Sequence, residues 1–162
     1  GMGGEEGCCL GRAPPGGKRG EPCEEGLGGG HCGPAPGTAY SLRKPYADAR
    51  KMLDLGLTVA LATDCNPGSS FTQSVPFVFG LAVMNMGMTV DEALYGCTLN
   101  AAKAIGVDGS CGSLERNKLA DLVVLDGDTP AILAYNCGVA PVLSVYKRGE
   151  CVVQRTDDRR IN

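Results

Sequence analysis

A short, almost wholly apolar run followed at once by a polar loop limits most strongly what this chain can fold into. Residues 57–63 read Leu-Thr-Val-Ala-Leu-Ala-Thr, and residues 64–70 read Asp-Cys-Asn-Pro-Gly-Ser-Ser. An apolar run of this length is typical of a parallel strand that is covered on both faces. Such strands belong to barrels or doubly wound sheets, where chemistry gathers at the carboxyl ends of the strands. The pattern therefore places Asp64 at a candidate active-site edge.

Two helix patterns lie on either side of this run. Pro45 suits the first turn of a helix that would extend to Leu55, and Gly56 would end it. A second, mostly apolar helix is predicted over residues 72–86, with Pro76 tolerated in its first turn. A buried strand that ends in a polar loop and leads into a helix is a βα unit.

A capping box and a later change of pattern complete the predicted elements. Thr89 would cap the next helix while Glu92 reaches back to the Thr89 backbone, and this helix would continue to Gly106. Beyond Gly109 the pattern changes to that of strands. The predicted strands cover residues 120–125, 142–147 and 151–154, and Arg148 and Gly149 join the last two as a hairpin.

The first 37 residues differ in composition from the rest of the chain. They contain 14 of the 25 glycines, five of the ten prolines and four of the nine cysteines, and almost no large apolar side chain. Such a segment cannot bury enough surface to offset its conformational entropy, so we expect it to be disordered. Its cysteines and His31 match no paired C-x2-C spacing, which favours a disordered tail over a zinc site.

Charge and length restrict the partners and the size of the fold. The net charge of −3 gives no reason to expect nucleic acid, and no apolar run reaches the roughly 18–20 residues of a membrane span. The N-terminus has no signal-peptide pattern, so the cysteines are expected as free thiols in the cytoplasm. The chain of 162 residues is shorter than a complete (β/α)8 barrel, which takes about 250.

Asp64 has two interpretations on physical grounds, and the residues alone do not choose between them. It could be a loop carboxylate that caps the backbone ahead of a turn at Pro67 and Gly68. It could equally be an oxygen ligand for a divalent cation at the mouth of a barrel, able to accept a proton from the water bound there.

A family resemblance favours the second interpretation. Residues 61–70 resemble the segment that follows the last barrel strand of imidazolonepropionases, which are amidohydrolase-superfamily enzymes of histidine breakdown. Residues 64–68 narrow the resemblance to this family, whereas residues 112–123 are similar to amidohydrolases in general. Other segments that resemble the family are residues 36–42, 46–50, 92–94 and 98–102.

The resemblance implies an α/β fold in three parts. Residues 1–35 would be a low-complexity leader unrelated to the family, and residues 36–110 the last βα units of a metal-dependent-hydrolase (β/α)8 TIM barrel. Residues 111–162 would supply strands of a composite β-sandwich and a tail. Asn117 stands where the superfamily usually has glycine, and asparagine also tolerates a left-handed turn.

The resemblance also implies a site and a reaction. Asp64 matches the aspartate that ligates the catalytic metal, Zn2+ or Fe3+ in the family, and helps to deprotonate the attacking water. Asn66 and Gly68 match positions that contact the open-chain product, and Ser69 matches one that contacts the cyclic substrate. The implied reaction opens the ring of 4-imidazolone-5-propanoate to N-formimidoyl-L-glutamate. Cys65 stands where phenylalanine is frequent, and no histidine near it in the sequence would activate its thiol.

The expected histidine ligands are missing. The family holds its metal with three histidines and the aspartate, and this chain has one histidine, His31, in a segment that resembles none of those strands. We therefore expect a truncated or mispredicted gene product that holds no metal stably and is inactive alone. Its open strand edges would favour association into a homo-oligomer. Two further interpretations stay open: another amidohydrolase, such as a deaminase or dihydroorotase relative, and a non-catalytic fragment. Thr98 and Asn100 are expected to serve helix packing.

Overall fold

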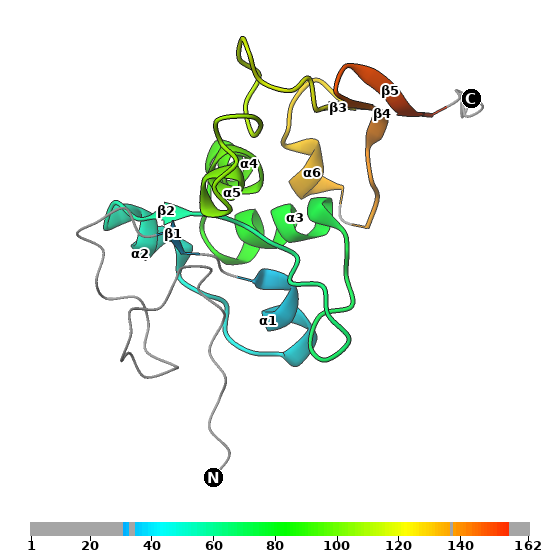
Figure 1. The fold of residues 1–162 in the computed structure, drawn as a ribbon. Helices are drawn as coiled ribbons and strands as arrows, with labels where there is room; N and C mark the ends of the chain where they lie inside the picture. Colours follow the sequence, from blue (N-terminus) through cyan, green and yellow to red (C-terminus); the bar gives the residue numbers. More distant parts are fainter. Residues whose placement is uncertain (1–30, 33–34, 137, 156–162) are drawn as a thin grey trace.

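A computed structural model describes residues 31–32, 35–136 and 138–155. In chain order the elements are β1 (His31–Cys32), α1 (Pro36–Leu42), α2 (Ala49–Asp54), β2 (Thr58–Val59), α3 (Val75–Asn85), α4 (Val90–Cys97), α5 (Leu99–Ala104), β3 (Leu122–Leu125), α6 (Ile132–Tyr135), β4 (Val142–Lys147) and β5 (Glu150–Gln154). Figure 1 shows helices grouped around α3, with β1 and β2 to one side and β3, β4 and β5 at the end that carries the C-terminus. The described part is therefore a mixed α and β fold, as the sequence predicts.

Strand β2 is shorter than the apolar run that predicts it. Its two residues pair in parallel with β1, and residues 60–63 continue beyond that pairing. The predicted strand over residues 57–63 is therefore too long, since only Thr58 and Val59 of the run form the ladder. The predicted disorder of residues 1–37 is wrong for β1 and for Pro36 and Gly37, which are buried in α1. Apart from β1 and Ala35, residues 1–35 lie outside the described residues.

Helices α2 and α3 begin later than predicted because a side chain caps each of them. Asp48 accepts a hydrogen bond from the backbone of the third residue of α2, so Pro45 lies before the helix and not in its first turn. Ser74 caps α3 in the same way, at 3.2 Å. The predicted stops are confirmed, since Gly56 and Gly87 follow the two helices with φ of 78° and 70°.

The helix predicted after the capping box is two helices. The box itself is confirmed: Thr89 accepts a hydrogen bond from the Glu92 N–H at 3.2 Å, and Glu92 accepts one from the Thr89 N–H at 2.8 Å. The helix breaks at Thr98, where φ is −121° and ψ is −93°. Because the Thr98 hydroxyl donates to the Leu94 carbonyl at 2.6 Å, a local side-chain bond accompanies the break.

Two helices are not predicted by the sequence pattern. Helix α1 forms where the resemblance implies a loop, and Pro36 occupies its first position, where proline's fixed φ suits a helix. Helix α6 is a single turn that packs on α3 and contributes Ala134 to the core. Both are short, so their periodicity is too brief to be read from the sequence.

The hydrophobic core lies between α2, β2, α3 and α4. Burial of each large apolar side chain contributes roughly 1.5–3 kcal/mol, which makes this cluster the main source of stability. Val59, Val78 and Phe79 are its most deeply buried large members. The cluster comprises Ala49, Val59, Leu61, Val78, Phe79, Ala82, Met86, Met88, Ala93 and Ala134. All but Ala134 come from the segment that we call the helical body, residues 35–110.

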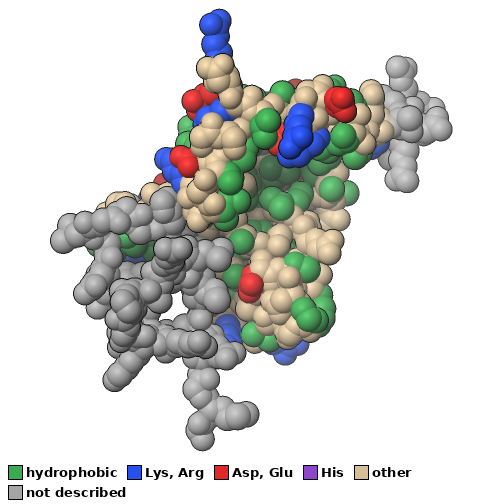
Figure 2. Space-filling model, viewed as in Figure 1, with side chains coloured by type: hydrophobic (Ala, Val, Ile, Leu, Met, Phe, Trp, Pro, Cys, Tyr) green, Lys and Arg blue, Asp and Glu red, His purple; other side chains and the backbone are tan. Residues whose placement is uncertain are grey.

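Strands β3, β4 and β5 form an antiparallel sheet, which we call the C-terminal sheet. The hairpin is confirmed: Arg148 and Gly149 join β4 to β5 with φ of 54° and 83°. Val123, Val152 and Val153 are 54%, 56% and 55% exposed, and Figure 2 shows hydrophobic side chains at the surface of this part of the molecule. No described helix is long and apolar enough to cross a membrane.

Candidate active site after the apolar run

Asp64 lies directly after the apolar run, in a loop that passes beside α1 (Figure 1). Its φ is 49°, a left-handed conformation that is uncommon outside glycine but tolerated by aspartate. The Thr38 hydroxyl of α1 donates to Asp64 Oδ2 at 2.8 Å. Since the Asp64 side chain is exposed, its carboxylate is open to a ligand from solvent.

The Asn66 side chain organises the loop. Its Nδ2 donates to the Asp64 carbonyl at 2.6 Å and to Ser69 Oγ at 3.1 Å. Its Oδ1 accepts from the backbone N–H groups of Gly68 and Ser69 at 2.9 and 2.8 Å. The three residues predicted to contact substrate or product are therefore brought together, with the Asn66 amide bonded inside the loop. A contact between that amide and a ligand would have to replace one of these bonds.

Helix α1 packs closely on the start and end of this loop. A Cβ atom on Gly37 would lie 3.0 Å from Ser70 Oγ and 3.2 Å from the Thr63 carbonyl oxygen. Ser70 is fully buried and donates to that same carbonyl at 3.0 Å. The absence of a side chain at Gly37 thus allows α1 to bring the Thr38 hydroxyl to Asp64.

The apolar run that leads to the loop is fixed from its other side by α4 and α5. The Leu61 N–H donates to the Gly96 carbonyl at 2.9 Å, and the Asn100 Nδ2 donates to the Val59 carbonyl at 2.9 Å. These bonds satisfy backbone groups that the short β2 pairing leaves free. Thr98 and Asn100 each donate to a backbone carbonyl within the helical body, although Thr98 does not cap the start of α5. Their predicted role in packing at the start of a helix stays a prediction.

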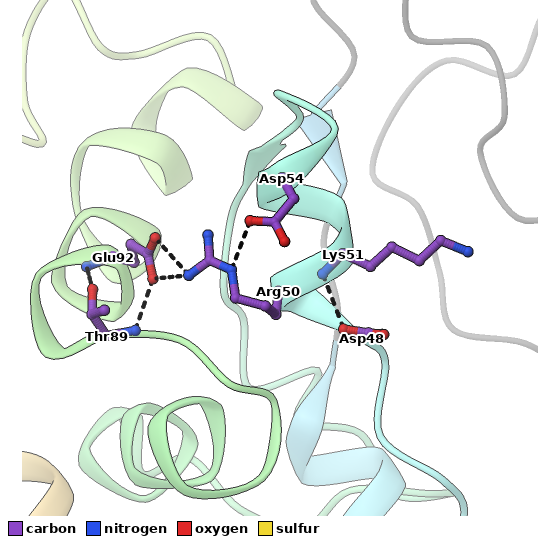
Figure 3. A network of polar contacts seen from close by, with 6 residues as sticks. All are labelled: Asp48, Arg50, Lys51, Asp54, Thr89 and Glu92. Atoms are coloured by element: carbon purple, nitrogen blue, oxygen red, sulfur yellow. Dashed lines mark hydrogen bonds and ion pairs between the residues drawn. The ribbon is translucent and has the colours of Figure 1, made fainter.

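A polar network ties α2 to α4 (Figure 3). Arg50 Nη1 donates to both carboxylate oxygens of Glu92 at 3.0 Å, and Arg50 Nε donates to Asp54 at 2.9 Å. The bond to Glu92 raises the pKa of Arg50. The Thr89 N–H, and then Arg50, lower the pKa of the Glu92 carboxyl. The network thus joins two helices that flank the apolar run.

Two cysteines near the run differ in burial. Cys65 follows Asp64 and is exposed, whereas Cys97 is half-buried in α4. Burial raises the pKa of the Cys97 thiol to about 11. A thiol with so high a pKa is protonated at neutral pH and a poor nucleophile, so Cys97 acts as a small apolar residue.

The described residues do not by themselves fit a zinc or iron centre. No group of three or more His, Cys, Asp or Glu side chains comes together in the described ranges. Such a centre takes three or more protein ligands. Asp64 offers one carboxylate, and one of its oxygens already accepts the Thr38 hydroxyl.

The sequence model of the amidohydrolase family matches residues 26–152. This chain belongs to the amidohydrolase family. The match begins at residue 26, within the segment 1–35 predicted to be unrelated to the family, and the predicted boundary after residue 35 stays a prediction.

Curated relatives confirm the resemblance to imidazolonepropionases. The chain is 61% identical over 113 residues to imidazolonepropionase of Syntrophobacter fumaroxidans, and the matched segment covers 70% of this chain and 27% of the relative. It is 62% identical over 117 residues to imidazolonepropionase of Desulfotalea psychrophila, and the matched segment covers 72% of this chain and 28% of the relative. The chain therefore spans little more than a quarter of the length of these relatives.

Solved structures share the fold. A zinc-bound adenosine deaminase from Xanthomonas campestris superposes with a TM-score of 0.59 at 23% identity, covering 75% of this chain and 31% of that chain. At this identity the similarity concerns the fold, and the deaminase chemistry stays with that protein.

Proposed function

We propose that this chain provides the Asp64 loop of an imidazolonepropionase-type hydrolase. The reaction is the hydrolysis of 4-imidazolone-5-propanoate to N-formimidoyl-L-glutamate, in which one water adds across a ring C–N bond and that bond breaks. The observation that carries the proposal is the high identity to imidazolonepropionases across the part of the chain that holds the loop. The loop geometry is consistent with it, since an exposed carboxylate stands beside organised amide and backbone groups.

Each loop residue has a distinct part in the proposal. Asp64 supplies the carboxylate that would ligate the family's Zn2+ or Fe3+ and accept a proton. Asn66 and Gly68 would lie against the open-chain product, and Ser69 against the cyclic substrate. Because the described residues do not form a complete metal centre, we propose that the 162-residue chain alone holds no stoichiometric zinc or iron and opens no ring.

The proposal extends to partners and place. The ligand is a small carboxylate-bearing molecule, nucleic acid and membrane take no part, and the chain acts in the cytoplasm. Association into a homo-oligomer would cover the exposed apolar side chains of the C-terminal sheet.

A chimera tests the reaction. Residues 36–153 of this chain would replace the matching segment of the Syntrophobacter fumaroxidans imidazolonepropionase. We expect the chimera to open imidazolonepropanoate and Asp64→Asn to abolish turnover, with Asp91→Asn as the surface control. A folded, metal-loaded chimera without activity, or with activity only on a deaminase substrate, would reject the proposal.

Metal analysis tests the proposal that the 162-residue chain alone holds no stoichiometric zinc or iron. Purified chain dialysed against zinc or ferric iron should contain much less than one metal per molecule by mass spectrometry. A tightly held metal together with ring opening would show that the chain completes the site without further segments.

A further inference from the structure

The hydrogen bond between Thr38 and Asp64 joins helix α1 to the loop that follows the apolar run. Thr38 belongs to α1, and Asp64 lies 26 residues further along the chain. The hydroxyl donates to Oδ2 at 2.8 Å, while Oδ1 accepts no hydrogen bond from the described residues. The two carboxylate oxygens are therefore not equivalent.

Buried contacts hold the backbone on both sides of this bond, although the side chains that make it are partly exposed. On the α1 side, Pro36 and Gly37 are buried, and Gly37 lies against Ser70 and the Thr63 carbonyl. On the loop side, Ser70 is fully buried. There the Asp64 carbonyl accepts the Asn66 amide at 2.6 Å. Because both backbones are fixed, the hydroxyl and the carboxylate meet without a large further loss of entropy.

We propose that Thr38 is a positioning residue for Asp64. Its hydroxyl holds the carboxylate in one rotamer and takes one of the two lone pairs of Oδ2, which makes Oδ1 the more accessible oxygen for a cation or a proton. This role rests on the proposed function, in which Asp64 supplies the carboxylate that ligates the metal and accepts a proton. It predicts that a ligand engages Oδ1 first, because the Thr38 hydroxyl already takes one of the two lone pairs of Oδ2.

Side-chain couplings in the isotope-labelled chain test the positioning directly. Three-bond couplings from the Asp64 backbone nitrogen and carbonyl carbon to Cγ report the χ1 rotamer. We expect a single rotamer in the wild type and in Thr38→Ser, which keeps a hydroxyl. Thr38→Val keeps the shape of the side chain but loses the hydroxyl. In this variant the ratio of the main Asp64 χ1 rotamer to the other rotamers should fall about tenfold, because a hydrogen bond to a charged group is lost.

Two further variants separate the hydroxyl from the fold. Ser41→Ala removes an exposed hydroxyl from the same helix and should leave the Asp64 couplings unchanged. Gly37→Ala keeps the Thr38 hydroxyl but pushes α1 away from the loop, so it should average the couplings as Thr38→Val does. Identical couplings in the wild type and a folded Thr38→Val would overturn the proposal.

A manganese titration distinguishes failure of this inference from failure of the proposed function. Mn2+ should broaden the Asp64 carboxyl carbon signal more than that of Asp91, an exposed aspartate on α4. It should do so less in Thr38→Val than in Thr38→Ser. Equal broadening of both aspartates in every variant would count against Asp64 as a ligand, and so against the proposed function. The couplings would still decide whether Thr38 positions Asp64.

Discussion

Phe79 in α3 and Val153 in β5 represent two regions that bury their apolar side chains to very different extents. Phe79 is 1% exposed within a cluster that joins α2, β2, α3 and α4. Val153 is 55% exposed, and every residue of β5 is exposed. The helical body is therefore stabilised by apolar burial, whereas the C-terminal sheet is joined by backbone ladders and by surface ion pairs.

The difference shows which region can tolerate the loss of one interaction. In the helical body, side chains far apart in sequence pack on one another and stabilise the region together. The loss of one polar contact there should therefore leave the region folded. In the C-terminal sheet, Asp121 accepts from Lys147 and from the Arg148 N–H, and Asp126 pairs with Arg155. Exposed pairs of this kind contribute little each. We expect the sheet to open locally before the body unfolds.

Truncation of Phe79 should give the largest difference in stability between the helical body and the C-terminal sheet. Phe79→Ala removes a fully buried ring and leaves a cavity, so we expect the free energy of unfolding to fall by about 3–5 kcal/mol in urea denaturation followed by circular dichroism. Val153→Ala is the control on the sheet and should change it by less than about 0.5 kcal/mol. Equal losses from the two variants would show that the sheet is as well packed as the body.

A methyl group at Gly112 should weaken the connection between the two regions. Gly112 has φ of 90°, and its Cβ would lie 2.5 Å from the Ala102 Cβ and 3.2 Å from the Thr98 carbonyl oxygen. We expect Gly112→Ala to cost about 1–3 kcal/mol through backbone strain and overpacking against α5. Gly109→Ala is the matched control, because nothing lies within 4 Å of its Cβ. The same urea series measures both, and similar values for the two would contradict the expected contact with α5.

The order of elements could be predicted from sequence wherever the signal is local. The capping box at Thr89, the hairpin at Arg148 and Gly149, and strand β4 all rest on neighbouring residues, and all are confirmed. The extent of β2 could not be predicted, because it depends on how far β1 pairs beside it. The break at Thr98 depends on one side-chain bond, which periodicity does not show.

The candidate site could be predicted only in part. The apolar pattern predicts Asp64 at the end of a strand over residues 57–63, but β2 ends at Val59 and Asp64 follows the rest of the apolar run. The proposed role of Asp64 follows from the resemblance. Thr38 was not predicted, because its hydroxyl reaches Asp64 only through the close packing of Gly37 on Ser70. A Pro-Gly-Thr segment that forms a short helix gives no sign of that contact in the sequence.

Acidification should give the smallest difference in stability between the helical body and the C-terminal sheet. Hydrogen bonds from Lys147 and then from the Arg148 N–H lower the pKa of Asp121, as the bonds from Thr89 and Arg50 lower that of Glu92. A carboxyl with a lowered pKa stabilises the fold above the ordinary value of about 4 and loses that effect as the pH falls through the lowered pKa.

Amide hydrogen exchange, followed residue by residue from pH 6 to about pH 3, should show which region depends on its carboxylate. Protection in β4 and β5 should fall before protection in α3, because α3 keeps its apolar core when Glu92 is protonated. Asp121→Asn should lower the protection of the sheet already at pH 6. Glu92→Gln, which can still bond the Thr89 N–H, should cost only about 0.5 kcal/mol. Simultaneous loss of protection in α3 and β5 would mean that the sheet and the helical body form one cooperative unit.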